Sequence, residues 1–348
     1  MNRKLIGHNR YGSIHGETIL SKRRIVHFLV AQLVAGAGLV PSPAAAQPYP
    51  NRAVTLIAPF AAGGDSDASG RNLAAVASKY LGQSLVMQNV VGASGMIGSQ
   101  RVRGSAADGY TLLIARGGSQ AIIPALDSKT PYKWNDFTFI SLLDFNPVAC
   151  VVKGDSPYRS IKDLLEVLKA QPGKLNYASA GPGTTQHMAV EVLLRTAGLA
   201  SNSAEQIGYK SGGEATAAVL SGQVQFLCNN LPTLGGQLKA GTMRGLLTTT
   251  SERLKDYPDI PAARELGFAP MEQVMGWSGL YGPPGLPPEV VAKWVDVLKR
   301  VAQDPDWIRG NAGFGAIPAI RSPAETEKFA REQFELYEKL GAALGLRK

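Results

Sequence analysis

The residues Val54-Thr-Leu-Ile-Ala-Pro-Phe-Ala-Ala-Gly-Gly-Asp-Ser-Asp67 join a short apolar run to a glycine-rich turn. The run from Val54 to Ala58 reads as a buried strand, and a helical pattern begins at Asp67. Gly63 and Gly64 let the backbone approach a ligand closely. Because free N–H groups at a helix start attract anions, the stretch predicts an anion-binding turn. Glycines also serve many turns that bind nothing, so this stretch alone leaves both readings open.

The same order of strand, glycine turn and helix start recurs twice further along the chain. Leu175 to His187 carries hydroxyl groups at Thr184 and Thr185, and Tyr209 to Glu214 repeats the pattern. If the three helix starts converge on a cleft, their N–H groups and hydroxyls can surround a carboxylate without a full counter-charge. Charge-assisted hydrogen bonds of roughly 1.5–3 kcal/mol each suffice for micromolar binding, which needs about 8 kcal/mol.

Strand-like runs alternate with helical patterns over the rest of the chain, which predicts an α/β protein with largely parallel sheets. The expected strands are 54–58, 85–90, 110–115, 148–153, 175–180, 205–210, 224–229, 243–249 and 274–281. The expected helices are 67–81, 161–170, 184–197, 213–221, 287–301 and 323–344. Such sheets bind ligands at the carboxyl ends of their strands.

The first 46 residues have the order of a secretory leader. Lys22, Arg23 and Arg24 precede an apolar run from Ile25 to Val40, and small residues follow up to Ala46. The run is shorter than the roughly 20 residues of a membrane span. We expect cleavage near Ala46 and export to the periplasm. The paired arginines leave twin-arginine export open beside the general route, although Lys22 stands where that signal usually has Ser or Thr.

Charge and composition exclude several classes of function. The chain has 348 residues, 45% of them hydrophobic, and a formal net charge of +9. The leader supplies +5 of this charge, so the mature chain has only a modest positive excess and no basic run. We therefore expect no nucleic-acid partner. Cys150 and Cys228 fit either a disulfide outside the cytoplasm or two buried thiols.

The sequence argues against an enzyme and predicts no cofactor and no metal. Of four histidines only His187 lies beyond the leader, so acid–base chemistry has one candidate, whose plainer interpretation is packing or capping. The chain lacks a G-x-S-x-G elbow, a phosphate-binding P-loop and a Cys or His cluster with metal-ligand spacing. A serine hydrolase using Ser66, Ser69, Ser94 or Ser179 remains the enzymatic alternative.

Taken as an ordered set, several stretches resemble the periplasmic solute-binding proteins of tripartite tricarboxylate transporters, the Bug family. These stretches are Tyr49-Pro50, Pro59-Phe-Ala-Ala-Gly-Gly64 with Asp67, Leu81-Gly82, Ala107-Asp-Gly-Tyr-Thr-Leu-Leu113, Gly183 to His187, Tyr209-Lys210, Gly222-Gln-Val224, Lys239-Ala-Gly241 and Trp277. They span nearly the whole mature chain in the family's order.

The resemblance implies a two-lobed, type II periplasmic-binding-protein fold that closes around a small carboxylate. Lobe one would comprise residues 48–145 plus 272–348, and lobe two residues 146–271. The protein would be a monomer that delivers its ligand to a permease with one large and one small integral-membrane subunit. An extracytoplasmic sensor that presents the same ligand to a signalling receptor is the alternative, since both roles need the same fold.

The predicted ligand-binding residues follow from these turns and from the resemblance. They are Phe60, Ala61, Ala62, Gly63, Gly64, Asp67, Arg116, Ser179, Gly183, Thr184, Thr185, Tyr209 and Asn229. Trp277 is expected in the core or at a hinge in preference to the cleft.

Four positions depart from the family's pattern where charge matters. Asp65 stands where Gly is usual, Arg116 where a small residue is usual, and Gln225 and Asn229 where Asp is common. If its side chain pointed into the cleft, Asp65 would repel a ligand carboxylate. The alternatives are that Asp65 points to solvent or meets a cationic or amino group of the ligand. Arg116 offers a two-pronged contact for an anion, or else lies at the surface or pairs with Asp65.

Overall fold

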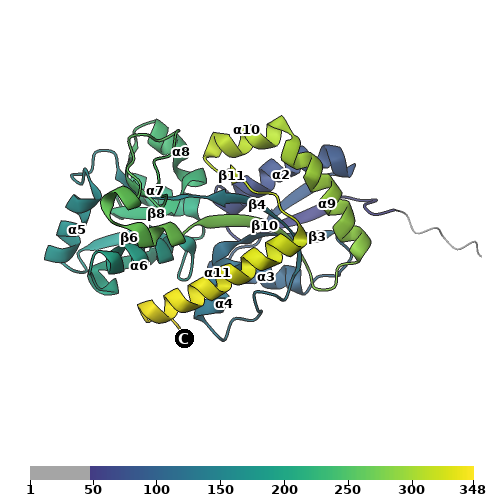
Figure 1. Cartoon of the computed structure of the whole chain (residues 1–348), viewed down its shortest axis with the longest axis horizontal. Helices are drawn as coiled ribbons and strands as arrows, with labels where there is room; N and C mark the ends of the chain where they lie inside the picture. Colours follow the sequence, from purple (N-terminus) through teal and green to yellow (C-terminus); the bar gives the residue numbers. More distant parts are fainter. Residues whose placement is uncertain (1–47) are drawn as a thin grey trace, which may run out of the picture. The chain divides into compact units, whose positions relative to one another are not determined.

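The computed structural model describes residues 48–348, which form one unit. The expected leader lies outside the described residues. Within that unit the strands form two separate sheets, each flanked by helices (Figure 1). We call the part built on the six-stranded sheet lobe one and the part built on the five-stranded sheet lobe two. The two-lobed α/β fold expected from the sequence is confirmed.

Lobe one holds its strands in the order β11-β4-β10-β3-β1-β2. Their bounds are β1 Val54–Ala58, β2 Leu85–Asn89, β3 Thr111–Arg116, β4 Thr138–Asn146, β10 Gly276–Gly282 and β11 Ile317–Pro318. The helices are α2 Asp65–Leu81, α3 Met96–Arg103, the turn η2 Gly118–Ile122 with α4 Ile123–Leu126, α9 Pro288–Gln303, α10 Pro305–Phe314 and α11 Pro323–Leu344.

Lobe two holds its strands in the order β7-β6-β8-β5-β9. Their bounds are β5 Val148–Lys153, β6 Leu175–Ser179, β7 Ala204–Gly208, β8 Phe226–Asn230 and β9 Met243–Thr248. The helices are α5 Ile161–Ala170, α6 Thr185–Thr196, α7 Gly212–Leu220 and α8 Leu231–Lys239. Short 3-10 turns cover Ser201–Ser203, Arg264–Leu266 and Ala269–Gln273, and another, Ala93–Gly95, precedes α3 in lobe one.

Both sheets are mixed, whereas we expected mainly parallel ones. β1 pairs in parallel with β2 and β3, and β6 in parallel with β7 and β8. β10 runs antiparallel to its neighbours in lobe one, and β5 does so in lobe two. The reason is that the chain changes lobes at these places. β4 ends at Asn146 and β5 begins at Val148, with only Pro147 between them, and β10 returns to lobe one after β9.

Apolar packing covers both faces of these sheets. Trp294 and Trp307 of α9 and α10 are fully buried against Leu56 and Leu73 in lobe one. A second cluster, around Ala178 and Leu227, lies within lobe two. Trp277 belongs to a third cluster with residues of both sheets and is fully buried, which confirms its expected place in the core.

Candidate functional site

The turn after β1 adopts the backbone that its glycines allow. Gly63 has a φ of 77°, a conformation that side chains other than glycine rarely adopt, and Gly64 is the N-cap of α2. Asp67 stabilises this turn, since its Oδ2 accepts hydrogen bonds from the Gly63 N–H at 3.2 Å and Arg71 Nε at 2.9 Å. Burial raises the pKa of Asp67, but these two donors outweigh it and hold the pKa below its ordinary value.

The turn after β6 is held by side chains of its own helix. Thr184 is the N-cap of α6, and its hydroxyl donates to the Gly181 carbonyl at 2.7 Å. His187 Nδ1 accepts a hydrogen bond from the Gly183 N–H at 3.2 Å, and its Nε2 lies 3.5 Å from the Glu191 carboxylate. Both ring nitrogens of the only histidine beyond the leader are therefore engaged by groups other than a serine.

The turn after β7 begins α7 in the same way. Ser211 is the N-cap and accepts a hydrogen bond from the Glu214 N–H at 3.2 Å. The Glu214 carboxylate accepts one in return from the Lys210 N–H at 3.1 Å. This leaves the N–H groups of Gly212 and Gly213 in the first turn, where a helix has no acceptor of its own for them.

The three helix starts meet at one small cavity between the lobes. It has a volume of about 30 Å³, which is room for about one water molecule. Its lining comes from lobe one and lobe two together: Phe60, Gly64, Asp65, Ser66, Arg116, Gly118, Ala180, Thr184, Thr185, Gln186, Gly212 and Asn230. The hydroxyl of Ser66 is buried there without a hydrogen-bond partner. A carboxylate enters only if the lobes separate, because the closed space is too small.

Five of the thirteen predicted ligand-binding residues line this cavity: Phe60, Gly64, Arg116, Thr184 and Thr185. Ala61, Ala62, Gly63 and Asp67 form the turn next to it, and Ser179, Gly183, Tyr209 and Asn229 lie behind or beside the lobe-two lining. Sequence reasoning had not selected Ser66, Gly118, Ala180, Gln186, Gly212 or Asn230. Ser66 and Gln186 adjoin predicted residues at helix starts, Gly212 lies in the third glycine turn, and Asn230 follows the predicted Asn229 and caps α8, so each has a local signal. Gly118 carries no such signal.

Arg116 points into the protein and pairs with Asp65. Its Nη2 lies 3.2 Å from Asp65 Oδ2, and both side chains are less than one-tenth exposed. Nη1 and Nη2 each make two hydrogen bonds, the remaining acceptors being Asn146 Oδ1 and Ser278 Oγ. Of the alternatives left open by the sequence, the structure therefore supports pairing of Arg116 with Asp65 over a surface position.

Asp65 also joins lobe one to lobe two. Its Oδ2 accepts a hydrogen bond from Asn230 Nδ2 at 2.5 Å, and its Oδ1 accepts one from Thr233 Oγ1 at 3.3 Å. Burial raises the pKa of Asp65 above its ordinary value, because lost hydration disfavours the carboxylate more than Arg116, Asn230 and Thr233 favour it. The inward-pointing acid raised as a possibility by the sequence is thus held by the protein itself.

Behind the cavity wall, polar side chains fix the helix starts of lobe two. Asn229 Nδ2 donates to the Gly212 carbonyl at 3.0 Å, and its Oδ1 accepts from Gln186 Nε2 at 2.7 Å. Ser179 Oγ accepts from the Gly181 N–H at 3.1 Å and from Gln206 Nε2 at 2.7 Å. Asn229 and Ser179 therefore act in this structure as supports of the turns that line the cavity.

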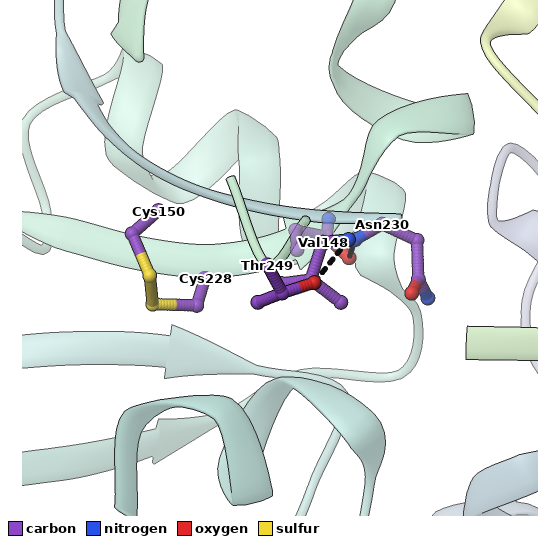
Figure 2. The surroundings of a disulfide bond; sticks show 6 residues. Val148, Cys150, Cys228, Asn230 and Thr249 are labelled. Atoms are coloured by element: carbon purple, nitrogen blue, oxygen red, sulfur yellow. Dashed lines mark hydrogen bonds between the residues drawn. A yellow bond between two sulfur atoms is a disulfide. The ribbon is translucent and has the colours of Figure 1, made fainter. Parts of the chain in front are cut away.

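A disulfide joins β8, the strand that carries Asn229, to β5. Cys150 of β5 faces Cys228 of β8 and is bonded to it, which decides between the two states the sequence left open. Figure 2 shows the bond close to Asn230 and to the strand end at Val148, whose N–H donates to Thr249 Oγ1 at 3.1 Å. The bond thus holds together the two strands next to the place where the chain enters lobe two.

In residues 48–348 no group of three or more His, Cys, Asp or Glu is placed to hold a metal ion. No helix within that same range combines the length and the apolar character of a membrane span.

Comparisons with known proteins agree with this architecture. BugT of Bordetella pertussis is 30% identical over 88% of this chain and 93% of its own length. Among solved structures, the periplasmic binding protein BugD has a TM-score of 0.81 at 30% identity, covering 86% of this chain and all of its own. MatC from Rhodopseudomonas palustris with bound malate has a TM-score of 0.79 at 29% identity, covering 84% and 99%. A second R. palustris protein, with adipate, has a TM-score of 0.81 at 28% identity, covering 85% and 98%.

The model of the tripartite tricarboxylate transporter family receptor matches residues 70–346, from α2 to the end of α11. This is most of the two-lobed unit and includes β3, β6 and β7, which lead to the cavity. The chain therefore belongs to the tripartite tricarboxylate transporter receptor family, whose members are periplasmic solute-binding proteins.

Proposed function

We propose that this protein is exported to the periplasm, captures a small carboxylate between its lobes and delivers it to a tripartite tricarboxylate-type permease. One observation carries the proposal: the starts of α2, α6 and α7, from both lobes, line one cavity. Each helix start presents N–H groups that lack acceptors within the helix, and its dipole favours negative charge. A carboxylate can use all three starts at once only when the lobes are closed on it.

The proposed contacts are the helix starts together with the nearby hydroxyls. Gly64 and Ser66 would act from lobe one, and Thr184, Thr185 and Gly212 from lobe two, with Phe60 against the apolar part of the ligand. The predicted neighbours Ala61, Ala62, Gly63, Asp67, Ser179, Gly183, Tyr209 and Asn229 would shape or support these turns. Relatives crystallised with malate and adipate support a carboxylate as ligand. We propose a binding protein and not an enzyme, since His187 has no serine partner.

Lobe bounds and export belong to the same proposal. We propose residues 48–145 plus 272–348 as lobe one and 146–271 as lobe two. The strands at 54–146 and 276–318 in one sheet and 148–248 in the other support this division. The basic, apolar and small-residue order before Ala46 supports a cleaved leader. The membrane partner is proposed as one large and one small permease subunit.

A thermal-shift screen of the purified protein against malate, adipate, citrate, 2-hydroxybutanoate and hexanoate, which include both mono- and polycarboxylates, tests the binding step. A ligand present at a hundred times its Kd stabilises the folded state by about 2.7 kcal/mol, which raises the melting temperature by a measurable amount. Isothermal titration calorimetry then gives the affinity of each ligand that responds. No change of melting temperature with any of the five at millimolar concentration would contradict the proposal.

A further inference from the structure

The cleft contains a carboxylate that belongs to the protein. Asp65 lines the cavity and is 8% exposed. Three donors hold it: Arg116 Nη2 at 3.2 Å, Asn230 Nδ2 at 2.5 Å and Thr233 Oγ1 at 3.3 Å. A guanidinium, an amide and a hydroxyl directed at one carboxylate are the groups a protein uses to bind the carboxylate of a ligand.

Both terminal nitrogens of Arg116 already donate to groups of the protein. Both of its Nη atoms make two hydrogen bonds each, shared among Asp65, Asn146 and Ser278. A ligand carboxylate that approached Arg116 would have to displace the Asp65 carboxylate, which is tied to both lobes. The positive charge of Arg116 is therefore already balanced by the Asp65 carboxylate.

The charge around Asp65 also disfavours a second ligand carboxylate. Asp144 of β4 is fully buried behind it, where Ser69, Asn146 and Ser278 donate hydrogen bonds to its oxygens. The cluster thus contains two carboxyl groups and one guanidinium, which pairs with Asp65, and it carries a formal excess of one negative charge. In a buried site this charge repels a further anion more strongly than it would in water.

We propose that Asp65 is a specificity-determining residue, which occupies with its own carboxylate the place of a ligand's second carboxylate. The cleft then takes small monocarboxylates, whose single anionic group meets the helix starts and Ser66, and it rejects dicarboxylates. This inference rests on the proposed function of the same cleft.

Calorimetry with matched ligand pairs tests the proposal. Each pair has the same number of carbons and differs in one terminal carboxylate: malate with 2-hydroxybutanoate, succinate with butanoate, and adipate with hexanoate. One pair will have the chain length that fits the cleft best. For that pair, we expect the unmodified protein to bind the monocarboxylate at least ten-fold more tightly than the dicarboxylate. Asp65→Gly, which installs the residue usual in the family, should shift this ratio at least ten-fold toward the dicarboxylate.

A second variant is needed because Asp65→Gly removes, together with the charge, the side-chain oxygens that accept hydrogen bonds from Arg116, Asn230 and Thr233. Asp65→Asn keeps the shape and an acceptor oxygen while removing the charge, and it should shift the ratio in the same direction. Asp155→Asn, on the exposed surface of lobe two, makes the same change in net charge and should leave the ratio unaltered. Melting curves establish which variants fold, and the ratio in the unmodified protein decides the question if neither Asp65 variant does.

The outcomes separate this inference from the proposed function. Equal or tighter binding of the dicarboxylates by the unmodified protein would overturn the inference and leave a carboxylate-binding protein. An unchanged ratio in a folded Asp65→Asn variant would also overturn it. If none of the six ligands binds, both the inference and the proposed function fail.

Discussion

The backbone N–H of Ala61 donates a hydrogen bond to the carbonyl oxygen of Lys210 at 3.2 Å. Ala61 follows β1 in lobe one, and Lys210 follows β7 in lobe two, so the bond joins the lobes main chain to main chain. Neither side chain takes part. The contact therefore depends on how closely the two backbones approach, and closure of the cleft is sensitive to any bulk placed between them.

Gly213→Ala should hold the lobes apart. A Cβ at Gly213 would lie 2.5 Å from the Gly63 carbonyl oxygen, which is backbone of the opposite lobe and has little freedom to yield. Overpacking of this kind costs about 1–3 kcal/mol, so ligand affinity should fall by roughly 5- to 150-fold. Calorimetry measures the affinity, and small-angle X-ray scattering should show a larger radius of gyration in the presence of ligand.

Gly236→Ala is the matched control for this variant. Gly236 lies in α8, and a Cβ there meets no atom within 4 Å. Replacing an exposed helical glycine by alanine stabilises a helix by up to about 1 kcal/mol, so the control should melt slightly higher and bind as before. An affinity loss of equal size in both variants would show that the close approach at Gly213 is not the cause.

Ser66→Ala should weaken ligand binding without weakening the fold. The Ser66 hydroxyl is 1% exposed, lines the cavity and has no partner, so its removal costs the folded state no hydrogen bond. A hydrogen bond to a carboxylate contributes about 1.5–3 kcal/mol, which corresponds to a loss of affinity of roughly 10- to 150-fold. Calorimetry and melting curves give the two quantities. Ser221→Ala, at the far end of α7, is the control and should leave affinity unchanged.

Asp304→Asn should make the free energy of unfolding fall less steeply as the pH is lowered. Hydrogen bonds from Lys79 and Tyr80 of α2 lower the pKa of Asp304 to about 2. A carboxyl with a lowered pKa stabilises the fold above its unfolded pKa of about 4, and the contribution disappears as the pH falls toward 2. Urea titrations between pH 5 and 2 should therefore show a shallower decline for the variant than for the unmodified protein.

The control for Asp304 is Asp296→Asn, because Asp296 lies exposed on α9. Its stability should decline with pH as steeply as that of the unmodified protein. If the free energy of unfolding falls equally steeply with pH in Asp304→Asn and in the unmodified protein, the contact between α2 and the start of α10 is not the cause of the pH dependence.

Replacing Cys150 and Cys228 together by alanine should lower the free energy of unfolding by about 2–5 kcal/mol. The bond closes a loop between residues 78 positions apart, and its loss restores conformational freedom to the unfolded chain. Denaturant titration measures the effect, and the unmodified protein under reducing conditions should show a similar loss. An unchanged unfolding midpoint in both samples would be incompatible with this expectation.

The sequence predicted most of the helices and strands, because hydrophobic spacing and capping residues act between residues that are close in the chain. The strands 54–58 and 148–153 and the helices 161–170 and 323–344 were placed with their observed bounds. α5 and α11 begin with capping boxes at Ser160 and Ser322, which are short-range signals. β4 was missed, since Ser141, Asp144 and Asn146 interrupt its apolar pattern and only the tertiary network gives them partners.

The departures at Asp65 and Arg116 could be seen in the sequence, but not their relationship. Their separation of 51 residues gives no indication that they touch, and Asn230 lies another 165 residues from Asp65. Contact between them follows from the pairing of β3 beside β1 and from the closure of one lobe on the other. The sequence therefore left Arg116 with three possible roles.

By itself, the sequence determined the strand–turn–helix units, because the periodicity of hydrophobic residues and the glycines of the turns involve only residues close in the chain. It also determined the family, through the order of these units. Only the tertiary structure decided which residues face the cavity and which stand behind it. The physical reason is that burial and pairing depend on distances between the lobes. A one-residue difference, as between Asn229 and Asn230, separates a support behind the wall from a group that lines the cleft.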